Sequence, residues 1–366
     1  MSSYQHLISP TANALLEVAL REKLLRRSHT TGELGELEPL AVRLGLIQNT
    51  LKPAFSAPQV IVFAADHGIA VDGIGASARH STHQLVRALL ASQMPLSVFA
   101  HIQQLELSVV DAGIAETANP HPRLLSRKIA HGTRSSRLTL AMSLEQAHGA
   151  IRAGMEIGDA LPGNAVLCAG IGVGSDYAAA MMLSRLAGVP IREFMPHGSG
   201  ARAHGVDAVI PILLGAMARH KEVNDPVEVL AALGGFEIAM LVGLMLVASG
   251  KRHLVMVDGL AACAALAVSS RISPAVVDYC VFCRSHSHPG LDRALRLFQA
   301  SSLLELGMDS IDGTGSTLAW PLVRSAAALL TEVAEGEDPG PSRPGELSTV
   351  TSADGPANRS MSASAS

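Results

Sequence analysis

The feature that most constrains the fold is a series of short apolar runs rich in β-branched residues, each ending at a small polar cluster. These runs cover residues 60–64, 107–110, 166–168, 253–257 and 276–282. Runs this short and apolar are typical of strands that are buried on both faces. Helical stretches separate them, so we predict an α/β protein with a parallel sheet covered by helices.

Helix signals between the runs support this class. Asp225 and Pro226 are typical of a helix start, and Gly234 and Gly235 end the same segment. The next segment, residues 236–249, is apolar almost all round, which places it either in the core or in a subunit interface.

Four regions are expected along the chain. Residues 1–55 form an N-terminal helical arm, residues 56–300 form the parallel α/β core, and residues 301–334 form a C-terminal helical part. Residues 335–366 are rich in Ser, Pro and Gly and lack large apolar residues, so we expect this tail to be disordered.

Composition excludes several classes of protein. Hydrophobic residues make up 48% of the 366 residues, yet the longest charge-free apolar run, residues 238–249, is far shorter than the roughly 20 residues of a membrane span. Four cysteines do not form a disulfide framework, and the start of the chain does not resemble a signal peptide, so a cytoplasmic protein is expected. A net charge of −4 with 3% aromatic residues argues against nucleic-acid binding and favours a small-molecule ligand.

The first candidate site is the sequence Gly-Ile-Gly-Val-Gly-Ser at residues 170–175, which follows a predicted strand and precedes a helix. Gly170, Gly172 and Gly174 would let backbone amides approach a phosphate at the positive end of the helix, with Ser175 as a further donor. A tight structural turn and a dinucleotide site are the alternatives. The dinucleotide pattern requires a third glycine, which is missing here. It also requires an acidic residue further along the chain, and Glu193 matches that spacing only loosely.

The second candidate site is Asp312, followed by Gly313 and Gly315 at the start of another predicted helix. The residue types alone favour an ordinary helix N-cap. The functional alternative is a carboxylate that the glycines aim into a cleft as a general base.

The third candidate contains Cys280, Cys283, His286 and His288, four possible zinc ligands within nine residues. The spacing is tighter than that of structural zinc sites and no second pair occurs, so we expect no metal site and favour two buried thiols followed by a polar loop. Asp66 and His67 are likewise interpreted as a hydrogen-bonded loop.

Six segments, taken in chain order, resemble the nicotinate-nucleotide:dimethylbenzimidazole phosphoribosyltransferase family of cobalamin biosynthesis. They are FAADHGIAVDGIGAS (residues 63–77), VVDAGIA (109–115) and the segments 131–154, 225–249, 255–266 and 303–330. The resemblance covers most of residues 1–334 and excludes the tail.

The resemblance implies a Rossmann-like parallel sheet with a smaller helical domain built from both terminal parts. It also implies a pentosyltransferase that moves phosphoribose from nicotinate mononucleotide to a benzimidazole, with inversion at the anomeric carbon and without metal or other cofactor. A homodimer is expected, and a heterodimer with a related chain is the alternative. Asp312 stands where the family has its proposed catalytic glutamate. The substrate-binding positions implied are Ser77, Gln84, Gly170, Gly172, Gly174, Ser175, Gly198, Ser199, Gly313 and Gly315.

Two departures from the family pattern are visible. Asp312 is shorter than the family glutamate, and Leu-Cys-Ala-Gly-Ile-Gly-Val-Gly-Ser at residues 167–175 replaces a family turn similar to Gly-Glu-Met-Gly-Ile-Gly-Asn-Thr-Thr. A missing methylene withdraws a carboxylate by roughly 1.5 Å, enough to slow a reaction about a hundredfold. Three interpretations stay open: the same reaction in a reshaped pocket, a different acceptor such as a purine or phenol, or an inactive partner subunit.

Overall fold

The computed structural model describes residues 8–27, 33–72, 80–195, 201–284, 289–308, 310 and 312–334. Ser77, Gly198, Ser199, His286, His288 and the tail from residue 335 lie outside the described residues. The expectations for those positions therefore stay predictions.

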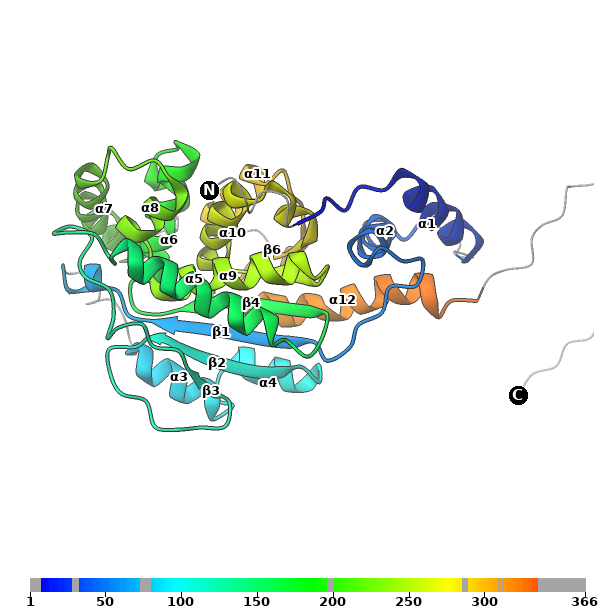
Figure 1. Ribbon diagram of the computed structural model, residues 1–366, viewed down its shortest axis with the longest axis horizontal. Coiled ribbons are helices and arrows are strands. Elements are labelled where there is room, and N and C mark those ends of the chain that lie inside the picture. Colours follow the sequence, from blue (N-terminus) through cyan, green and yellow to red (C-terminus); the bar gives the residue numbers. More distant parts are fainter. Residues whose placement is uncertain are drawn as a thin grey trace, which may run out of the picture.

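The core is a parallel sheet of seven strands (Figure 1). The strands are β1 Gln59–Ala65, β2 Glu106–Gly113, β3 Leu124–Ser126, β4 Ala165–Ile171, β5 Leu254–Val257, β6 Cys280–Arg284 and β7 Ser302–Leu304. Their order is β3-β2-β1-β4-β5-β6-β7, and each neighbouring pair is parallel. This confirms the predicted α/β class. Strand order reverses between β1 and β4, and ligands of such sheets bind beyond the carboxyl ends of the strands at that point.

Helices cover both faces of the sheet. Figure 1 shows α5, α9 and α10 on one side of the strands and α3 and α4 on the other, and α12 contacts β6, β7 and α4. The described α-helices are α1 Ala14–Arg27, α2 Leu37–Gln48, α3 Thr82–Leu90, α4 Pro95–Ile102, α5 Leu144–Asp159, α6 Ser175–Ala187, α7 Ala201–Arg219, α8 Pro226–Leu233, α9 Phe236–Gly250, α10 Leu260–Ile272, α11 Pro289–Leu297 and α12 Thr314–Thr331.

The helix start predicted at Asp225 is confirmed, because its carboxylate accepts the amides of Val227 and Glu228 at 2.9 and 3.2 Å. The apolar helix α9 lies in the core of the single chain, packed against α5, α10 and β1. Its burial is nearly complete without a second subunit, so the core interpretation holds.

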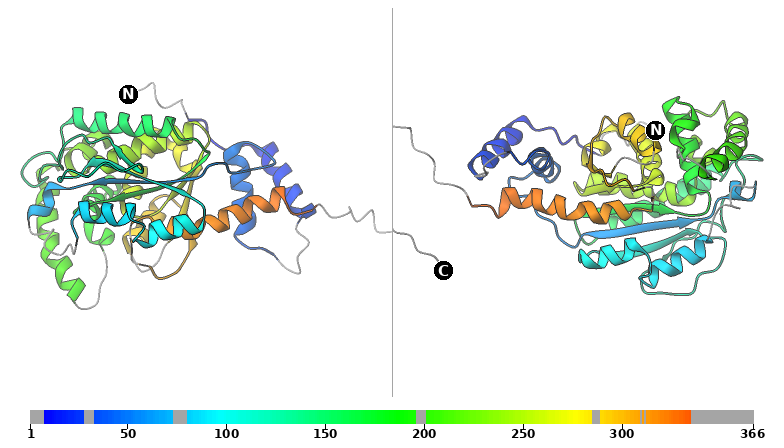
Figure 2. Two further views of the ribbon diagram at one scale, coloured as in Figure 1. Left: turned by 90° about the horizontal axis from the view of Figure 1, so that it is seen from below. Right: turned by 180° about the vertical axis from the view of Figure 1, so that it is seen from behind.

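Both terminal parts of the described chain meet at one end of the molecule. Helices α1 and α2 pack against α12, as Figure 2 also shows from two further directions. Residues 302–304, expected in the C-terminal helical part, add the edge strand β7 to the sheet instead. The division of the chain into domains stays a prediction.

One strand prediction differs from the structure, and two strands were not predicted. Residues 276–282 were expected as one strand, but a 3₁₀ helix, η4 Pro274–Tyr279, precedes β6. Pro274 fixes its own φ and has no N–H to donate to a neighbouring strand, which favours the helical turn. The edge strands β3 and β7 span three residues each, too few for an alternating pattern to be recognised.

By length and composition, residues 82–102 could cross a membrane. In the structure this stretch is two helices, α3 and α4, which are separated by a break between Leu90 and Pro95. Each helix is much shorter than the roughly 20 residues that a span requires, so the stretch is weak evidence for one.

Helices α5 and α9 touch through glycines. A Cβ added at Gly154 would lie 1.9 Å from the carbonyl oxygen of Met240, and one at Gly243 would lie 2.0 Å from the carbonyl oxygen of Ile151. The two backbones are therefore in direct contact, and any larger residue forces the helices apart.

We predict that Gly154→Ala lowers the free energy of unfolding by at least about 2 kcal/mol, because overpacking here must move backbone. Gly149→Ala is the matched control on the same helix, since its Cβ would meet no atom closer than 3.9 Å. That control should raise stability by roughly 0.5–1 kcal/mol through helix propensity. Urea denaturation measures both variants, and equal effects would contradict the close contact.

Candidate active site at the carboxyl edge of the sheet

The clusters that follow β1 and β4 lie side by side at the point where strand order reverses. Ala64 pairs with Ile171, and the amide of His67 donates to the carbonyl of Val173 at 3.2 Å. The glycine turn predicted as a phosphate loop therefore lies directly against His67.

Asp66 is occupied by contacts within the protein. One carboxylate oxygen accepts the hydroxyl of Thr82 at 2.5 Å, and the other accepts the amide of Ala115 at 2.7 Å. The same hydroxyl of Thr82 accepts the amide of Val173 at 2.9 Å. Asp66 thus ties the ends of β1 and β2 to α3, as the hydrogen-bonded-loop interpretation expects.

His67 is paired with Glu237 at the start of α9. Its Nε2 lies 2.7 Å from Oε1 of Glu237, and the side chains are 1% and 0% exposed. Burial alone would lower the pKa of His67, but the charge of Glu237 and its hydrogen bond outweigh burial, and the pKa is raised. The contact is therefore an imidazolium–carboxylate pair inside the protein.

Ser175 joins this pair, because its hydroxyl donates to the same Oε1 of Glu237 at 2.8 Å. Within the described part of the chain, Oε2 of Glu237 has no hydrogen-bond partner. In the sequence, Glu237 is visible only as an interruption of an apolar run, and its role was missed. A lone carboxylate in a buried helix must find a cation, and that signal could have marked it.

The glycine turn is closely packed. A Cβ at Gly170 would lie 2.7 Å from that of Ala261, and one at Gly172 would lie 1.7 Å from the carbonyl oxygen of Ala65. Gly174 has φ +93°, a conformation that favours glycine. The turn needs its glycines for packing and conformation, whatever it binds.

Two amides of this turn are already used within the protein. That of Val173 donates to Thr82, and that of Ser175 donates to the carbonyl of Gly172 at 3.1 Å. With carboxylates beside it, this geometry favours the structural-turn alternative over a phosphate cradle. A phosphate role for Gly170, Gly172, Gly174 and Ser175 stays a prediction.

A second buried ion pair lies at the ends of β5 and β6. Nε of Arg284 is 2.8 Å from Oδ1 of Asp258, both side chains are at most 1% exposed, and Nη1 of Arg284 donates to the carbonyl of Met308 at 2.9 Å. Burial raises the pKa of Asp258 to about 6; the charge of Arg284 opposes this shift and that of Asp312 adds to it.

Gly315 packs directly on this pair, since its Cβ would lie 2.4 Å from Cδ of Arg284. This close contact explains why a glycine occupies position 315. A substrate-binding role was expected of this residue. Polar clusters after both strands are visible in the sequence, but Asp258 and Arg284 could not be paired from it, because no local pattern shows that β5 and β6 are neighbours.

Asp312 lies in the loop before α12, and its Oδ1 accepts the amide and the hydroxyl of Thr314 at 3.1 and 2.7 Å. Gly313 has φ +90°, and its Cβ would meet that of Ala169 on β4 at 2.5 Å, so the loop lies over the end of β4. Among the described residues nothing donates a hydrogen bond to Oδ2 of Asp312. One oxygen caps the helix start and the other is available for chemistry.

Asp176, in the first turn of α6, is a further carboxylate that sequence reasoning missed. Burial raises its pKa to about 7; the charge of His67 opposes the shift, and those of Glu237 and Asp312 add to it. A carboxyl group that titrates near neutral pH beside other acids is typical of functional sites.

The other candidates lie apart from this cluster. Gln84, an exposed residue of α3, accepts the amide of Ser81 through its side chain at 3.0 Å in a capping box. Cys280 and Cys283 are buried, and burial raises the pKa of Cys280 to about 12. No group of three possible metal ligands occurs in the described ranges.

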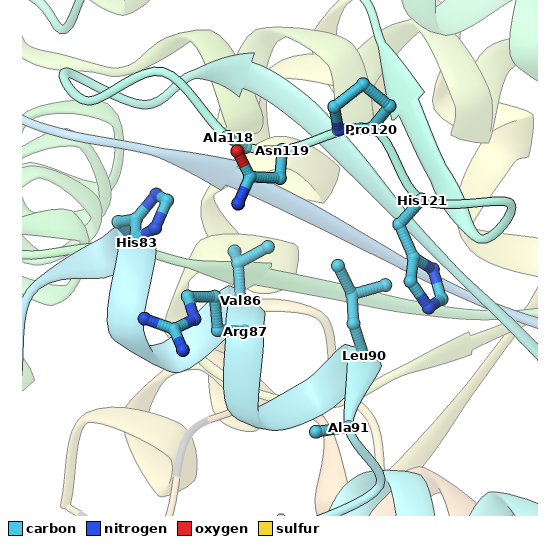
Figure 3. A pocket seen from close by; sticks show the side chains of 9 residues that line it. All are labelled: His83, Val86, Arg87, Leu90, Ala91, Ala118, Asn119, Pro120 and His121. Carbon is cyan, nitrogen blue, oxygen red and sulfur yellow. The ribbon is translucent and has the colours of Figure 1, made fainter.

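A surface pocket of about 240 Å³ lies between α3 and residues 118–121 (Figure 3). It is lined by His83, Val86, Arg87, Leu90, Ala91, Ala118, Asn119, Pro120 and His121. None of the predicted site residues lines it, so it is separate from the cluster at the carboxyl edge.

The comparisons with known proteins establish the class. A family profile described as Phosphoribosyltransferase matches residues 9–340, and the chain belongs to this family of transferases. The nicotinate-nucleotide–dimethylbenzimidazole phosphoribosyltransferase of Variovorax paradoxus is 39% identical over 336 residues, which cover 92% of this chain and 96% of the relative. The enzyme of the same name from Cupriavidus taiwanensis is 41% identical over 330 residues, 89% of this chain and 95% of the relative.

Solved structures agree. The crystal structure of CobT from Thermus thermophilus matches with a TM-score of 0.81 at 29% identity and covers 86% of this chain and 96% of that chain. The family resemblance stated from the sequence is confirmed.

The site has a consequence for stability at different pH values. The pKa of Asp176 is about 7 and that of Asp258 about 6 in the folded protein, against roughly 3.9 in an unfolded chain. The folded state therefore binds more protons than the unfolded state between about pH 4 and 7. The stability that these groups contribute is present below pH 4 and lost as the pH rises through 6 and 7.

We predict that Asp176→Asn stabilises the protein at pH 8 by on the order of 1–3 kcal/mol and leaves it little changed at pH 4, because the amide cannot ionise. Denaturant unfolding of parent and variant across pH 4–8 measures the difference. Parallel curves would show that Asp176 titrates alike in the folded and unfolded chains.

Proposed function

We propose that this protein transfers the phosphoribosyl group of nicotinate mononucleotide to 5,6-dimethylbenzimidazole or a related base. The products are nicotinate and α-ribazole 5′-phosphate, for assembly of the cobalamin nucleotide loop. The observation that carries the proposal is full-length similarity to transferases of that name. Asp312 supports it, because its carboxylate lies over β4 at the strand-order reversal with one oxygen unoccupied by described residues.

The chemistry follows from the residues. The bond between C1′ and the ring nitrogen of nicotinate breaks, and its electron pair stays on that nitrogen. The unprotonated ring nitrogen of the base forms the new bond to C1′, and the N–H proton on the other ring nitrogen passes to Asp312 as general base. The carboxylate also attracts the positive charge that the base acquires as it attacks.

Asp312→Asn should lower kcat at least about a hundredfold, within the usual contribution of a general base, with little change in affinity for nicotinate mononucleotide. The amide oxygen can still accept from Thr314, so stability should change by less than about 1 kcal/mol. Asp312→Glu should match or exceed the parent, because it restores the longer reach. Chromatographic detection of nicotinate, with a panel of benzimidazoles, purines and phenols as acceptors, measures all three proteins.

Two outcomes would contradict the proposal in different ways. Full activity of Asp312→Asn would reduce this residue to a helix cap and remove the general base. Absence of nicotinate release by the parent with every acceptor would favour the inactive partner subunit.

We also propose a homodimer in the cytoplasm. Leu138, Leu140 and Leu144 are 64%, 38% and 42% exposed within a short stretch, which a second copy would cover. Analytical ultracentrifugation should show a dimer at micromolar concentration, and a monomer there would count against the proposal.

A further inference from the structure

We propose that Asp176 is a second catalytic carboxylate, which together with Asp312 holds the positive charge that moves across the ribosyl carbon during transfer. The inference rests on the proposed function and deepens it. It assigns a role to a residue that neither the family resemblance nor the predicted site includes.

The position of Asp176 supports this role. It follows Ser175, whose hydroxyl is held by Glu237, so the first turn of α6 is fixed against the point where strand order reverses. Gly313 holds the Asp312 loop over Ala169 of β4, the strand that leads into the same turn. Two different elements thus place Asp176 and Asp312 near the end of one strand, and the charge of Asp312 acts on Asp176.

The distribution of charge supports it further. Glu237 contacts His67, and Asp258 contacts Arg284, so each of these buried acids has a cation of its own. Neither Asp176 nor Asp312 forms an ion pair with any residue that the structure describes. Asp66 also lacks an ion pair, but both of its oxygens accept hydrogen bonds. Among the described acids of the site, only Asp176 and Asp312 combine an unpaired charge with a carboxylate oxygen that accepts no hydrogen bond.

A second, independent observation concerns the floor of the site. Glu237 is 0% exposed, yet both of its hydrogen bonds go to Oε1, and Oε2 is without a partner among the described residues. An unsatisfied buried carboxylate oxygen is costly, so this place favours a ligand that brings a hydrogen-bond donor or positive charge.

The titratable groups that act on Asp176 are His67 at the end of β1, Glu237 on α9 and Asp312 before α12. Burial raises the pKa of Tyr177, the next residue on α6, and the charge of Asp176 adds to this shift. Burial and the two like charges keep Asp176 partly protonated near pH 7, and a cation in the site would drive that proton off.

Nicotinate mononucleotide supplies such a cation, because its pyridinium nitrogen is bonded to C1′. As that bond breaks, the electron pair neutralises the nitrogen and positive charge moves to C1′. It then passes to the base, whose proton goes to Asp312. The charge stays within one small region throughout, so fixed carboxylates can stabilise each stage without rearrangement.

Binding of nicotinate mononucleotide is the first test. Calorimetric titration at pH 7, repeated in buffers that differ in ionisation enthalpy, should show proton release by the parent and less than a third as much by Asp176→Asn. The affinity of the parent should rise about tenfold from pH 5.5 to 8, and that of Asp176→Asn should stay flat. Asp176→Glu keeps the charge and should retain the pH dependence.

Turnover is the second test. Asp176→Asn should lower kcat/KM for nicotinate mononucleotide by at least tenfold at pH 8, although the variant is expected to be the more stable protein there. Asp207→Asn is the control, because Asp207 is 65% exposed on α7 and pairs with Arg192 on the surface. It should behave as the parent in every assay.

The outcomes separate the two proposals. An active parent whose pH-dependent binding and turnover survive in Asp176→Asn would overturn the role of Asp176 and leave the transferase function intact. A parent that binds with proton release but turns over no base would overturn the function and retain Asp176 as a binding group. A parent that does not bind nicotinate mononucleotide would overturn both.

Discussion

The buried contact between Glu237 and His67 is the interaction on which the centre of the molecule depends. A carboxylate inside an apolar helix is stable only with a partner, and His67 at the end of β1 provides it. Ser175 binds the same oxygen, so β1, α6 and α9, far apart in sequence, meet at one group. The space around the pair is filled: a Cβ at Gly235 would lie 2.3 Å from the His67 ring. The floor of the site is therefore rigid.

This arrangement determines the sign of the net charge of the site. The buried pairs His67–Glu237 and Asp258–Arg284 are each neutral as a whole, so the net charge comes from the acids without an ion pair among the described residues, which are Asp66, Asp176 and Asp312. An anion placed between them would meet repulsion, whereas a pyridinium or a developing ribosyl cation would be attracted. In the proposed reaction, the strand-order reversal therefore favours the reacting cation over the phosphate.

Sequence reasoning located the edge of the sheet but not the contacts across it. Periodicity and turn residues indicated the central strands and showed that polar residues such as Asp258 and Arg284 follow them. That these two face each other depends on β5 and β6 being neighbours, which no local pattern encodes. Glu237 was hidden for a related reason, because its partner lies 170 residues away. The fold class was accessible from sequence, and a catalytic role for Asp312 was predicted only through the family resemblance; the buried charge pairs required the fold.

The departures from the family pattern are explained by a change in the position of a negative charge. Cys168 stands where the family turn has an acid, and it is fully buried in β4 between β1 and β5. Burial raises the pKa of its thiol, so this position carries no charge in the folded protein. Asp176 returns a carboxylate shortly after the same segment, in the first turn of α6. Relative to the family pattern, the position of the negative charge differs more than its amount. The altered turn is therefore compatible with the same transfer reaction.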